Sequence, residues 1–447
     1  SYEKAIEINP DYAKAHYNLG NAQHDLSLQR FGQLSLNREL DDPIKSYKRS
    51  IEIDPDYAEA HNNLGNVFQD LGRLDEAFEC FEKALIINPD YVEAHYSLGI
   101  VLFDLGQFDD AVQAYTKAIE LNPNLAQAHN NLGNTFAEQG QLNEAIHSYQ
   151  KALELNPNYS EAYNSLGNVF IEQGQFNDAI ISYQKALEIN PNYPALHNNL
   201  GNAYKQLGQS QDALDSYSKG LTYNPDYIDL INNIGVILND LGRFDEAVKN
   251  YKRAIVIKPD YAEAYNNLGV TYNKLGQLDK AVHSYEEALK IDADYADAHN
   301  NLGVVLGKMG LATDALKSFE KAIDLMIKTL TINPNDSNTL NNLGIAYYKL
   351  NQHDDAIKSY QKALIINPEY SEAHNNLGIV YFSLEKVDEA NKQFKKAIKL
   401  RSDYALAHKN LGDTYKHKGE DKKALKSYNM AIKINPKLNE LISNKNE

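Results

Sequence analysis

Histidine is the residue type in this chain best suited to bind a metal ion or to transfer protons. The sequence has 13 histidines. Eight of them recur at one place of a repeated pattern: His16, His61, His95, His129, His197, His299, His374 and His408. Residues that recur once per packed helical unit stand about 10 Å apart, whereas bonds to a metal are about 2 Å long. We therefore expect packing histidines, with neither a metal site nor a cofactor.

Other arrangements that support catalysis are missing from the sequence. It has no HExxH zinc motif, no GxxxxGK[ST] phosphate loop and no GxSxG nucleophile turn. Paired acids such as Asp109 and Asp110 stand where a helix is expected to begin, and the helix dipole favours carboxylates there. The sequence thus indicates that this segment is not an enzyme.

Asparagine is the polar residue with the most regular spacing. A carboxamide both donates and accepts hydrogen bonds, so a row of them could hold the backbone of an extended ligand with little regard to its side chains. The alternative is that the neighbouring asparagines, such as Asn130, serve only solubility and that the row does not bind a ligand. The row is interrupted by Ser97 and Ser165 and consists of Asn18, Asn63, Asn131, Asn199, Asn233, Asn267, Asn301, Asn342, Asn376 and Asn410.

The stretch from Ala126 to Pro157 shows the unit that must position these side chains. Counted from Ala126 as place 1, places 3, 4, 7, 8 and 11 share one side of a helix, and the asparagines at places 5, 6 and 9 fall on the opposite side. Gly140 suits the end of this helix, Asn143 can cap a second helix, and Pro157 ends that one. The unit is a helical hairpin whose place-6 asparagines should line the inner, concave wall formed by the first helices.

The hairpin recurs along the whole chain, and nine of the eleven intervals between its place-8 glycines are 34 residues. These glycines are Gly20, Gly65, Gly99, Gly133, Gly167, Gly201, Gly235, Gly269, Gly303, Gly344, Gly378 and Gly412. Such a hairpin, with small residues at places 8, 20 and 27, an aromatic residue at place 24 and proline at place 32, resembles the tetratricopeptide repeat. The resemblance implies an all-α fold, a right-handed superhelical α-solenoid of stacked helix-turn-helix units, and a generic protein-binding scaffold.

The predicted organisation is a single solenoid over residues 1–447. Residues 1–10 would be the second helix of a truncated repeat, residues 11–436 twelve repeats, and residues 437–447 a partial first helix or a polar cap. Eleven extra residues near 27–40 separate the helices of the first repeat. Because surface insertions cost little entropy, they are either tolerated drift or a contact loop.

A second irregularity is an insertion of seven residues near 324–331. Seven residues make almost two helical turns, so they would lengthen a second helix while keeping its buried face in phase. We expect one uninterrupted helix over Asp314–Thr331. Its extra residues would project beyond the usual edge of the solenoid, where either the next joint covers them or a partner binds them. These residues are Leu325, Met326, Ile327 and Leu330.

Three departures from the repeat pattern predict weaker local structure. Asn351 and Glu385 replace the glycine at place 15, which predicts looser turns. Gly220 replaces the usual alanine at place 27, which should loosen that second helix by up to about 1 kcal/mol.

The formal net charge is −17, which argues against general nucleic-acid binding, because affinity for phosphate rests on clustered Lys and Arg. The charge is uneven: residues 386–447 hold 15 basic and 8 acidic residues, which gives +7 there and −24 before it. These lysines form either a solvated face or a docking surface for an acidic partner. No apolar run approaches the roughly 18 to 20 residues of a membrane span, so no membrane insertion is expected. A single cysteine, Cys80, rules out an intrachain disulfide.

Places 9 and 13 divide the expected groove into two halves. In the first six repeats these places are mostly Asn and acidic residues, as in Asn66 and Asp70. In repeats seven to eleven place 9 is aliphatic, and Lys274, Lys308 and Lys349 occupy place 13 of three consecutive repeats. We expect an extended or helical protein segment with apolar side chains and acidic flanks to bind against Val270, Val304 and Ile345, beside the amides of Asn267, Asn301 and Asn342.

Two classes of function remain open. The asparagine row resembles that of the tetratricopeptide region of O-linked N-acetylglucosamine transferases, which implies substrate-protein binding in the groove and an attached catalytic domain. The other class is a structural protein whose open ends stack into an oligomer or filament. Such a contact would use Ala5, Ile6 and Ile8 at one end and Leu438, Leu441 and Ile442 at the other.

Overall fold

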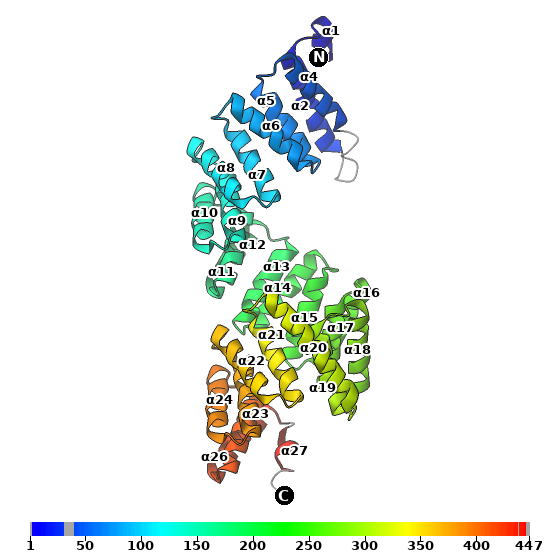
Figure 1. Ribbon diagram of the computed structural model, residues 1–447, viewed down its shortest axis with the longest axis vertical. Helices are drawn as coiled ribbons and strands as arrows, with labels where there is room; N and C mark the ends of the chain where they lie inside the picture. The colour runs from blue at the N-terminus through cyan, green and yellow to red at the C-terminus, as the bar shows by residue number, and fades with distance from the viewer. Residues whose placement is uncertain (1, 31–39, 437, 444–447) are drawn as a thin grey trace. The chain divides into compact units, whose positions relative to one another are not determined.

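The computed structural model describes residues 2–30, 40–436 and 438–443, and these residues form helices joined by short turns, without a strand among them (Figure 1). The predicted all-α solenoid of helical hairpins is therefore confirmed. The chain divides into two compact units, Ser1–Leu230 and Ile231–Glu447.

Unit 1 consists of α1 (Tyr2–Ile8), α2 (Ala13–Arg30), α4 (Asp41–Ile53), α5 (Ala58–Asp70), α6 (Leu74–Ile87), α7 (Val92–Asp104), α8 (Phe108–Leu121), α9 (Ala126–Glu138), α10 (Leu142–Leu155), α11 (Ser160–Glu172), α12 (Phe176–Ile189), α13 (Pro194–Gln206) and α14 (Ser210–Tyr223). The unit boundary falls within α15 (Ile228–Asp240).

Unit 2 continues with α16 (Phe244–Ile257), α17 (Ala262–Lys274), α18 (Leu278–Ile291), α19 (Ala296–Lys308), α20 (Ala312–Ile332), α21 (Ser337–Lys349), α22 (His353–Ile366), α23 (Ser371–Ser383), α24 (Val387–Leu400), α25 (Ala405–His417), α26 (Asp421–Ile434) and α27 (Leu438–Ser443). In both units first helices pack on the second helix of their own repeat and on that of the preceding repeat, as α9 does with α10 and α8. First helices of consecutive repeats also contact one another, as α9 does with α7 and α11.

The repeat of α9 and α10 shows how the turns form. Gly140 has a φ of 71°, and the N–H of Gln141 donates to the Phe136 carbonyl at 2.8 Å, which closes α9 with a Schellman motif. The helix α10 begins at Leu142, and Gln141 is its N-cap residue, without a side-chain cap. The prediction that Asn143 caps this helix is wrong, because Asn143 already lies in the first helical turn.

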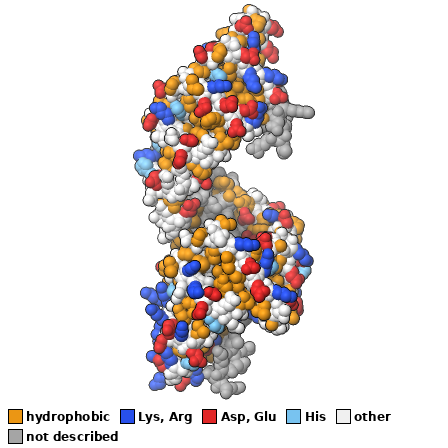
Figure 2. All heavy atoms as spheres, in the orientation of Figure 1, with side chains coloured by type: hydrophobic (Ala, Val, Ile, Leu, Met, Phe, Trp, Pro, Cys, Tyr) orange, Lys and Arg blue, Asp and Glu red, His pale blue; other side chains and the backbone are white. Residues whose placement is uncertain are grey.

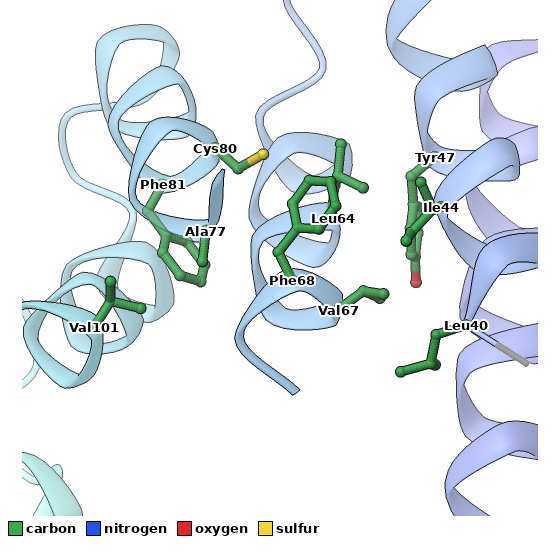
Figure 3. Packing of buried hydrophobic residues seen from close by; sticks show 10 residues of the cluster. All are labelled: Leu40, Ile44, Tyr47, Leu64, Val67, Phe68, Ala77, Cys80, Phe81 and Val101. Carbon is green, nitrogen blue, oxygen red and sulfur yellow. The ribbon is translucent and has the colours of Figure 1, made fainter. Parts of the chain in front are cut away.

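Place-24 aromatic rings and place-8 glycines form the core of each repeat. Tyr149 is buried, and a Cβ atom on Gly133 would lie 2.7 Å from its ring, so only glycine lets α9 and α10 approach this closely. Figure 3 shows the corresponding layer in the first repeats, where Tyr47, Leu64 and Phe81 pack in a row between neighbouring helices.

The predicted long helix is present. The helix α20 has 21 residues without a break, compared with 14 in α18 and α22. Leu325 and Met326 are buried, Leu330 is half-buried and Ile327 is exposed. Two alternatives were open for these residues: cover by neighbouring parts of the chain, or binding by a partner. Leu325 and Met326 are covered within the chain, whereas Ile327 remains exposed.

The three weak positions are accommodated without loss of helix or turn. Asn351 and Glu385 have φ angles of 58° and 62°, close to the 70° to 80° of the glycines at the same place. The expected looser turns are therefore absent: the two residues adopt the left-handed conformation of glycine. Gly220 lies inside a continuous α14, and a Cβ atom there would be 2.6 Å from Leu230 Cδ1, so a larger neighbour fills the space of the usual alanine.

The C-terminal helix α27 covers the last repeat. Leu438 and Ile442 are buried in one cluster with Tyr428, so the expectation that they form an exposed contact end is wrong for these two residues. At the other end Ile8 is exposed, and Ala5 and Ile6 are half-buried. The side chain of Leu441 and most of the insertion near 27–40 lie outside the described residues. No helix in the described ranges is long and apolar enough to cross a membrane.

Candidate functional site

The eight recurring histidines have a structural role. In each of them Nε2 lies 2.8–3.2 Å from the backbone carbonyl of the residue six positions earlier, in the turn before the first helix. Because a carbonyl only accepts, Nε2 carries the hydrogen and donates it. Burial also lowers the pKa of His61, His197 and His374, which favours the neutral ring. The predicted packing role is confirmed.

The place-6 asparagines form a hydrogen-bonded ladder along the first helices. All ten are half-buried, and in unit 2 most donate their amide to the place-5 asparagine of the preceding repeat. The donor and acceptor pairs are Asn267 with Asn232 at 3.2 Å, Asn301 with Asn266 at 3.0 Å, Asn376 with Asn341 at 3.1 Å and Asn410 with Asn375 at 3.0 Å.

In unit 1 the same donors find more varied partners. Asn199 donates to Asn164 at 3.1 Å, as in the ladder of unit 2. Where a tyrosine occupies place 5, its hydroxyl accepts instead: Asn131 donates to Tyr96 at 3.3 Å, and Asn63 to Tyr17 at 3.1 Å. Place 6 therefore connects consecutive first helices in both units, which gives it a structural role that the sequence did not indicate.

The place-5 asparagines are not solvent-facing, contrary to expectation. Seven of them are at most 6% exposed: Asn62, Asn130, Asn232, Asn266, Asn300, Asn341 and Asn375. The reason is that place 5 lies where neighbouring first helices touch, a contact that the pattern of one helix cannot reveal. A buried carboxamide needs partners, and the ladder supplies them, so solubility does not explain these residues.

The ladder is interrupted at three points in the described residues. Ser97 and Ser165 replace the place-6 donor, and the Oδ1 atoms of Asn62 and Asn130 in the repeats before them have no hydrogen-bond partner in the described part of the chain. The third buried oxygen without a hydrogen-bond partner among the described residues is Asn300 Oδ1. Its expected donor, Asn342, follows the long helix α20 and donates to the Asp297 carboxylate at 2.8 Å instead.

In several repeats the asparagine at place 9 accepts a hydrogen bond from the core tyrosine. The Tyr149 hydroxyl donates to Asn134 at 2.8 Å, and the Tyr183 hydroxyl to Asn168 at 2.7 Å. In the aliphatic half Val270 takes this place, and the buried hydroxyl of Tyr285 has no partner among the described residues. Val270 therefore leaves the buried Tyr285 hydroxyl unsatisfied, at a cost of about 1–3 kcal/mol for such a group.

A pocket opens beside one of the predicted apolar residues. It has a volume of about 390 Å³ and lies between α19, α20 and α21, where Val304, Gly307, Leu316 and Phe319 provide apolar surface. Lys308 and Lys349 stand on its rim. Val270 and Ile345 are half-buried on the neighbouring first helices and do not line it. Of the three predicted apolar residues, only Val304 lines this pocket.

The rim lysines are close enough to repel each other. Lys308 donates to Asn273 Oδ1 at 2.8 Å, and its pKa is lowered, first by burial and then by the charge of Lys349. An anionic group placed between them would relieve this repulsion. Sequence reasoning found the lysines and Val304 but missed Gly307, Leu316 and Phe319. The available signal was Gly307, a glycine at place 12, and the exposed Leu316 of the second helix.

Family models match most of the chain. One model described as TPR repeat matches residues 1–27, 39–72, 99–140, 133–173, 167–208, 235–276, 271–310 and 380–419. Three models described as tetratricopeptide repeat match residues 294–366; residues 58–91, 194–227 and 405–438; and residues 80–113 and 359–391. None of the curated proteins compared with the sequence matches it.

Several solved structures are similar to parts or most of this chain. The crystal structure of YrrB, described as a TPR protein with an unusual peptide-binding site, is 29% identical, covers 42% of this chain and 96% of its own, and has a TM-score of 0.37. The crystal structure of MamA protein is 28% identical over 38% of this chain and 93% of its own, with a TM-score of 0.36. A chain in the crystal structure of the APC/C hetero-tetramer Cut9–Hcn1 is 16% identical, covers 93% of this chain and 92% of its own, and has a TM-score of 0.47. On the family matches, this chain belongs to the tetratricopeptide repeat family.

Proposed function

We propose that this chain is a non-catalytic interaction scaffold that binds an extended or helical protein segment on the first helices of unit 2. The observation that carries the proposal is the pocket at Val304, which combines an apolar floor with Lys308 and Lys349 on its rim. Members of the family serve as protein-binding scaffolds, so a site of this kind is in keeping with the fold. The segment would place an apolar side chain in the pocket and acidic residues beside the lysines.

The ladder beside the pocket can contribute to backbone recognition. Asn301 donates one amide hydrogen to Asn266, and a carboxamide has two such hydrogens and a carbonyl oxygen. Because Asn301 is half-buried, part of its amide remains within reach of a ligand. The same holds for Asn267 and Asn376, which also use one N–H in the ladder. The amides would bind backbone groups, while the pocket would select the side chain.

Charge decides which segments bind. Lys308 and Lys349 are exposed and lie near each other, so the rim attracts acidic residues and repels basic ones. In unit 1 the equivalent places hold Asp25, Asp70 and Asp104. An acidic segment is therefore expected to prefer unit 2, and this preference should weaken as salt screens the charges.

The test is binding of a fluorescent peptide with two leucines between acidic flanks, measured by anisotropy. Val304→Asn should weaken binding about tenfold, because it makes the pocket floor polar. Phe319 in this repeat has no hydroxyl, so the new asparagine does not gain the tyrosine contact found elsewhere. The matched control is Ile100→Asn, the aliphatic residue at the same place in unit 1. Equal losses in the two variants, or no loss in Val304→Asn, would contradict the proposal.

A second arm tests the ladder separately. Asn301→Ala removes an amide next to the pocket, and Asn199→Ala removes its counterpart in unit 1. Both lose one ladder hydrogen bond, so their stabilities should fall by similar amounts, about 1 kcal/mol. Only Asn301→Ala should also weaken binding of the peptide. Thermal unfolding of all four variants shows whether a change in affinity merely follows a change in stability.

The alternative, end-to-end assembly, has less support. Its C-terminal contact needs Leu438 and Ile442, which are buried within the protein's own last repeat. Light scattering of the purified chain at micromolar concentration would decide the matter, since a monomer removes the filament hypothesis.

A further inference from the structure

A second kind of groove recurs on the opposite side of the repeats, between the second helices of neighbouring repeats. Its floor is formed by places 4, 7 and 11 of the first helix between them, and its walls by places 19, 22, 23 and 26 of the following second helix. Four such grooves occur in the described residues, between α8 and α10, α12 and α14, α20 and α22, and α24 and α26. The groove is thus a general product of the repeat, and its chemistry depends on a few side chains.

The groove between α24 and α26 has unusual chemistry. Its volume is about 620 Å³, the largest of the four, within the range of ligand-binding pockets. Four lysines line it: Lys395, Lys423, Lys426 and Lys433. The other grooves include carboxylates, such as Glu144, Asp212 and Asp355. Figure 2 shows the Lys and Arg side chains gathered at the lower left, over the second helices of the last repeats.

One of these lysines occupies a place that disfavours it. Lys423 lies in the first turn of α26, at place 19, where Glu144, Asp212 and Asp355 stand in the other grooves. The helix dipole stabilises a carboxylate there and destabilises an ammonium group. Lys423 forms an ion pair with Glu420, which compensates in part. A local rule broken without a gain in folding is a feature of functional sites.

The floor of the groove is apolar and adaptable. Ile398, Leu411 and Tyr415 line it, and the ammonium groups of Lys395 and Lys423 each lie 5.5 Å from the centre of the Tyr415 ring. Met430 is 41% exposed and takes place 26, which is Lys151 in the groove between α8 and α10. Methionine is flexible and suits surfaces that bind varied apolar side chains. The groove therefore offers apolar contact between positive walls.

The spacing of the wall residues indicates the shape of the ligand. Lys423, Lys426, Met430 and Lys433 follow one face of α26 at steps of three, four and three residues. These are the steps at which two helices pack along each other, and the row is about 15 Å long. A partner helix of about three turns would match it, with apolar residues over Met430 and acidic residues over the lysines.

We propose that the groove between α24 and α26 binds an acidic amphipathic helix of a partner protein. Its apolar stripe would contact Ile398, Tyr415 and Met430, and its carboxylates would pair with Lys395, Lys426 and Lys433. This site is separate from the first-helix face of the proposed function and does not depend on it. A protein helix fits better than nucleic acid, because a phosphate backbone would leave the apolar floor without a contact.

The probe is a fluorescein-labelled 18-residue peptide, about the length that is helical in water, with a leucine stripe flanked by glutamates. Its binding to the full chain is measured by anisotropy at low and physiological salt. Lys426→Glu/Lys433→Glu should weaken binding about tenfold or more. The matched control is Lys358→Glu/Lys362→Glu, which makes the same change of net charge in the groove between α20 and α22. The control should change affinity less than about twofold.

Two further variants separate apolar contact from charge. Met430→Lys should weaken binding of the peptide although it adds a positive charge, because it removes apolar surface from the groove. A peptide with glutamine in place of glutamate should bind weakly to the natural chain and should not distinguish the Lys426→Glu/Lys433→Glu variant from it. All substituted side chains are exposed, and thermal unfolding verifies that each variant is folded. If the double variant unfolds, Lys426→Gln and Lys433→Gln replace it and should each weaken binding.

Four outcomes would overturn the proposal. Equal losses in the double variant and its control would show general charge attraction, as would equal binding of a polyglutamate peptide without leucines. Tighter binding of a DNA duplex or of phosphatidylserine vesicles, lost in the double variant, would assign the groove to another ligand. Self-association of the chain that disappears in the double variant would make the acidic part of a second copy the occupant.

Discussion

Asn342 donates its side-chain amide to the carboxylate of Asp297 at 2.8 Å, while Asn300, in the place that the ladder uses elsewhere, keeps a buried Oδ1 without a partner in the described structure. The cause is the long helix α20, which separates the two first helices α19 and α21 by seven more residues than usual. The ladder is therefore broken in the repeats that carry the Val304 pocket. The seven-residue insertion, the break in the ladder and the pocket therefore all occur in the repeats formed by α19 to α21.

This relationship predicts an unusual dependence of stability on pH. The pKa of Asp297 is raised, chiefly by burial, which the hydrogen bond from Asn342 offsets only in part. A carboxyl whose folded pKa lies above its unfolded pKa binds a proton more readily in the folded state, so stability is lost as pH rises between the two values. Asp297→Asn keeps the acceptor for Asn342 and removes the charge. The variant should be more stable than the natural chain at neutral pH, and the difference should shrink as pH falls.

Thermal unfolding of both proteins between pH 3 and pH 8 measures this difference, because other carboxyls titrate equally in the two. Asp294→Asn is the control, since the pKa of that exposed carboxyl is lowered by Lys321. Asp294→Asn should therefore show the opposite trend with pH. A constant difference between the natural chain and Asp297→Asn would contradict the raised pKa.

A second prediction concerns the unsatisfied hydroxyl of Tyr285. Val270→Asn should provide the acceptor that Asn168 provides for Tyr183, and should raise the free energy of unfolding by about 1 kcal/mol. The reciprocal change, Asn168→Val, should lower it by about 1–3 kcal/mol, because it leaves the Tyr183 hydroxyl buried and unpaired. Urea unfolding measures both. A loss of stability in Val270→Asn would show that the packing lost with the valine outweighs the hydrogen bond gained by Tyr285.

The hairpins and the long helix could be predicted from the sequence, because each depends on periodicity within one repeat. The period of 3.6 residues identifies the buried face, and seven inserted residues preserve it, which is why α20 is continuous. The packing role of the eight histidines followed from the same reasoning. These features need no knowledge of how one repeat lies against the next.

The ladder and the pocket required that knowledge. Asn130 is polar and opposite the core stripe of α9, yet it is buried because α9 touches the first helices of both neighbouring repeats. The pattern of polar and apolar residues around α9 alone contains no information about its contacts with neighbouring first helices. The pocket likewise combines Val304 of α19 with Leu316 of α20 and Lys349 of α21, and its shape depends on the missing side chain of Gly307. Sequence reasoning therefore named some of the residues that line this pocket and missed the others.

A third prediction uses the two turns that lack glycine. Glu385 has a φ of 62°, a conformation that costs a residue with a Cβ atom about 1–2 kcal/mol. Glu385→Gly should relieve this cost and stabilise the repeat by about 1 kcal/mol, after the greater freedom of glycine in the unfolded chain is subtracted. Asn351→Gly should gain less, because asparagine tolerates this region. Hydrogen exchange of amides in α23 and α24 measures the local effect.

The reverse substitution checks the interpretation. Gly276→Glu places the same side chain in an equivalent turn, where φ is 74° and no atom lies near the glycine. It should destabilise α17 and α18 by about the amount that Glu385→Gly gains. If Gly276→Glu were neutral, the conformation of the turn would not be the source of the strain.

The last prediction concerns the pair of Gly220 and Leu230. Most repeats place alanine at both positions, as with Ala152 and Ala162, which are fully buried. Here Leu230 is also fully buried, and a Cβ atom on Gly220 would lie 2.6 Å from its Cδ1 and 3.0 Å from the His197 Cβ. The two residues therefore compensate each other in volume, although the preceding joint packs a buried Leu196 together with Ala186.

A double-mutant cycle tests this compensation. Gly220→Ala should destabilise by about 1–3 kcal/mol through overpacking, although alanine favours a helix, and Leu230→Ala should cost about 2–5 kcal/mol because it leaves a cavity. The double variant restores the alanine pair of the other repeats and gains about 1 kcal/mol of helix propensity, so it should be much more stable than the sum of the two losses implies. Because Gly220 and Leu230 lie in the same unit, hydrogen exchange in α14 reports the coupling directly. Additive losses would mean that α14 moves to accept the alanine, and that Leu230 does not determine the choice of glycine.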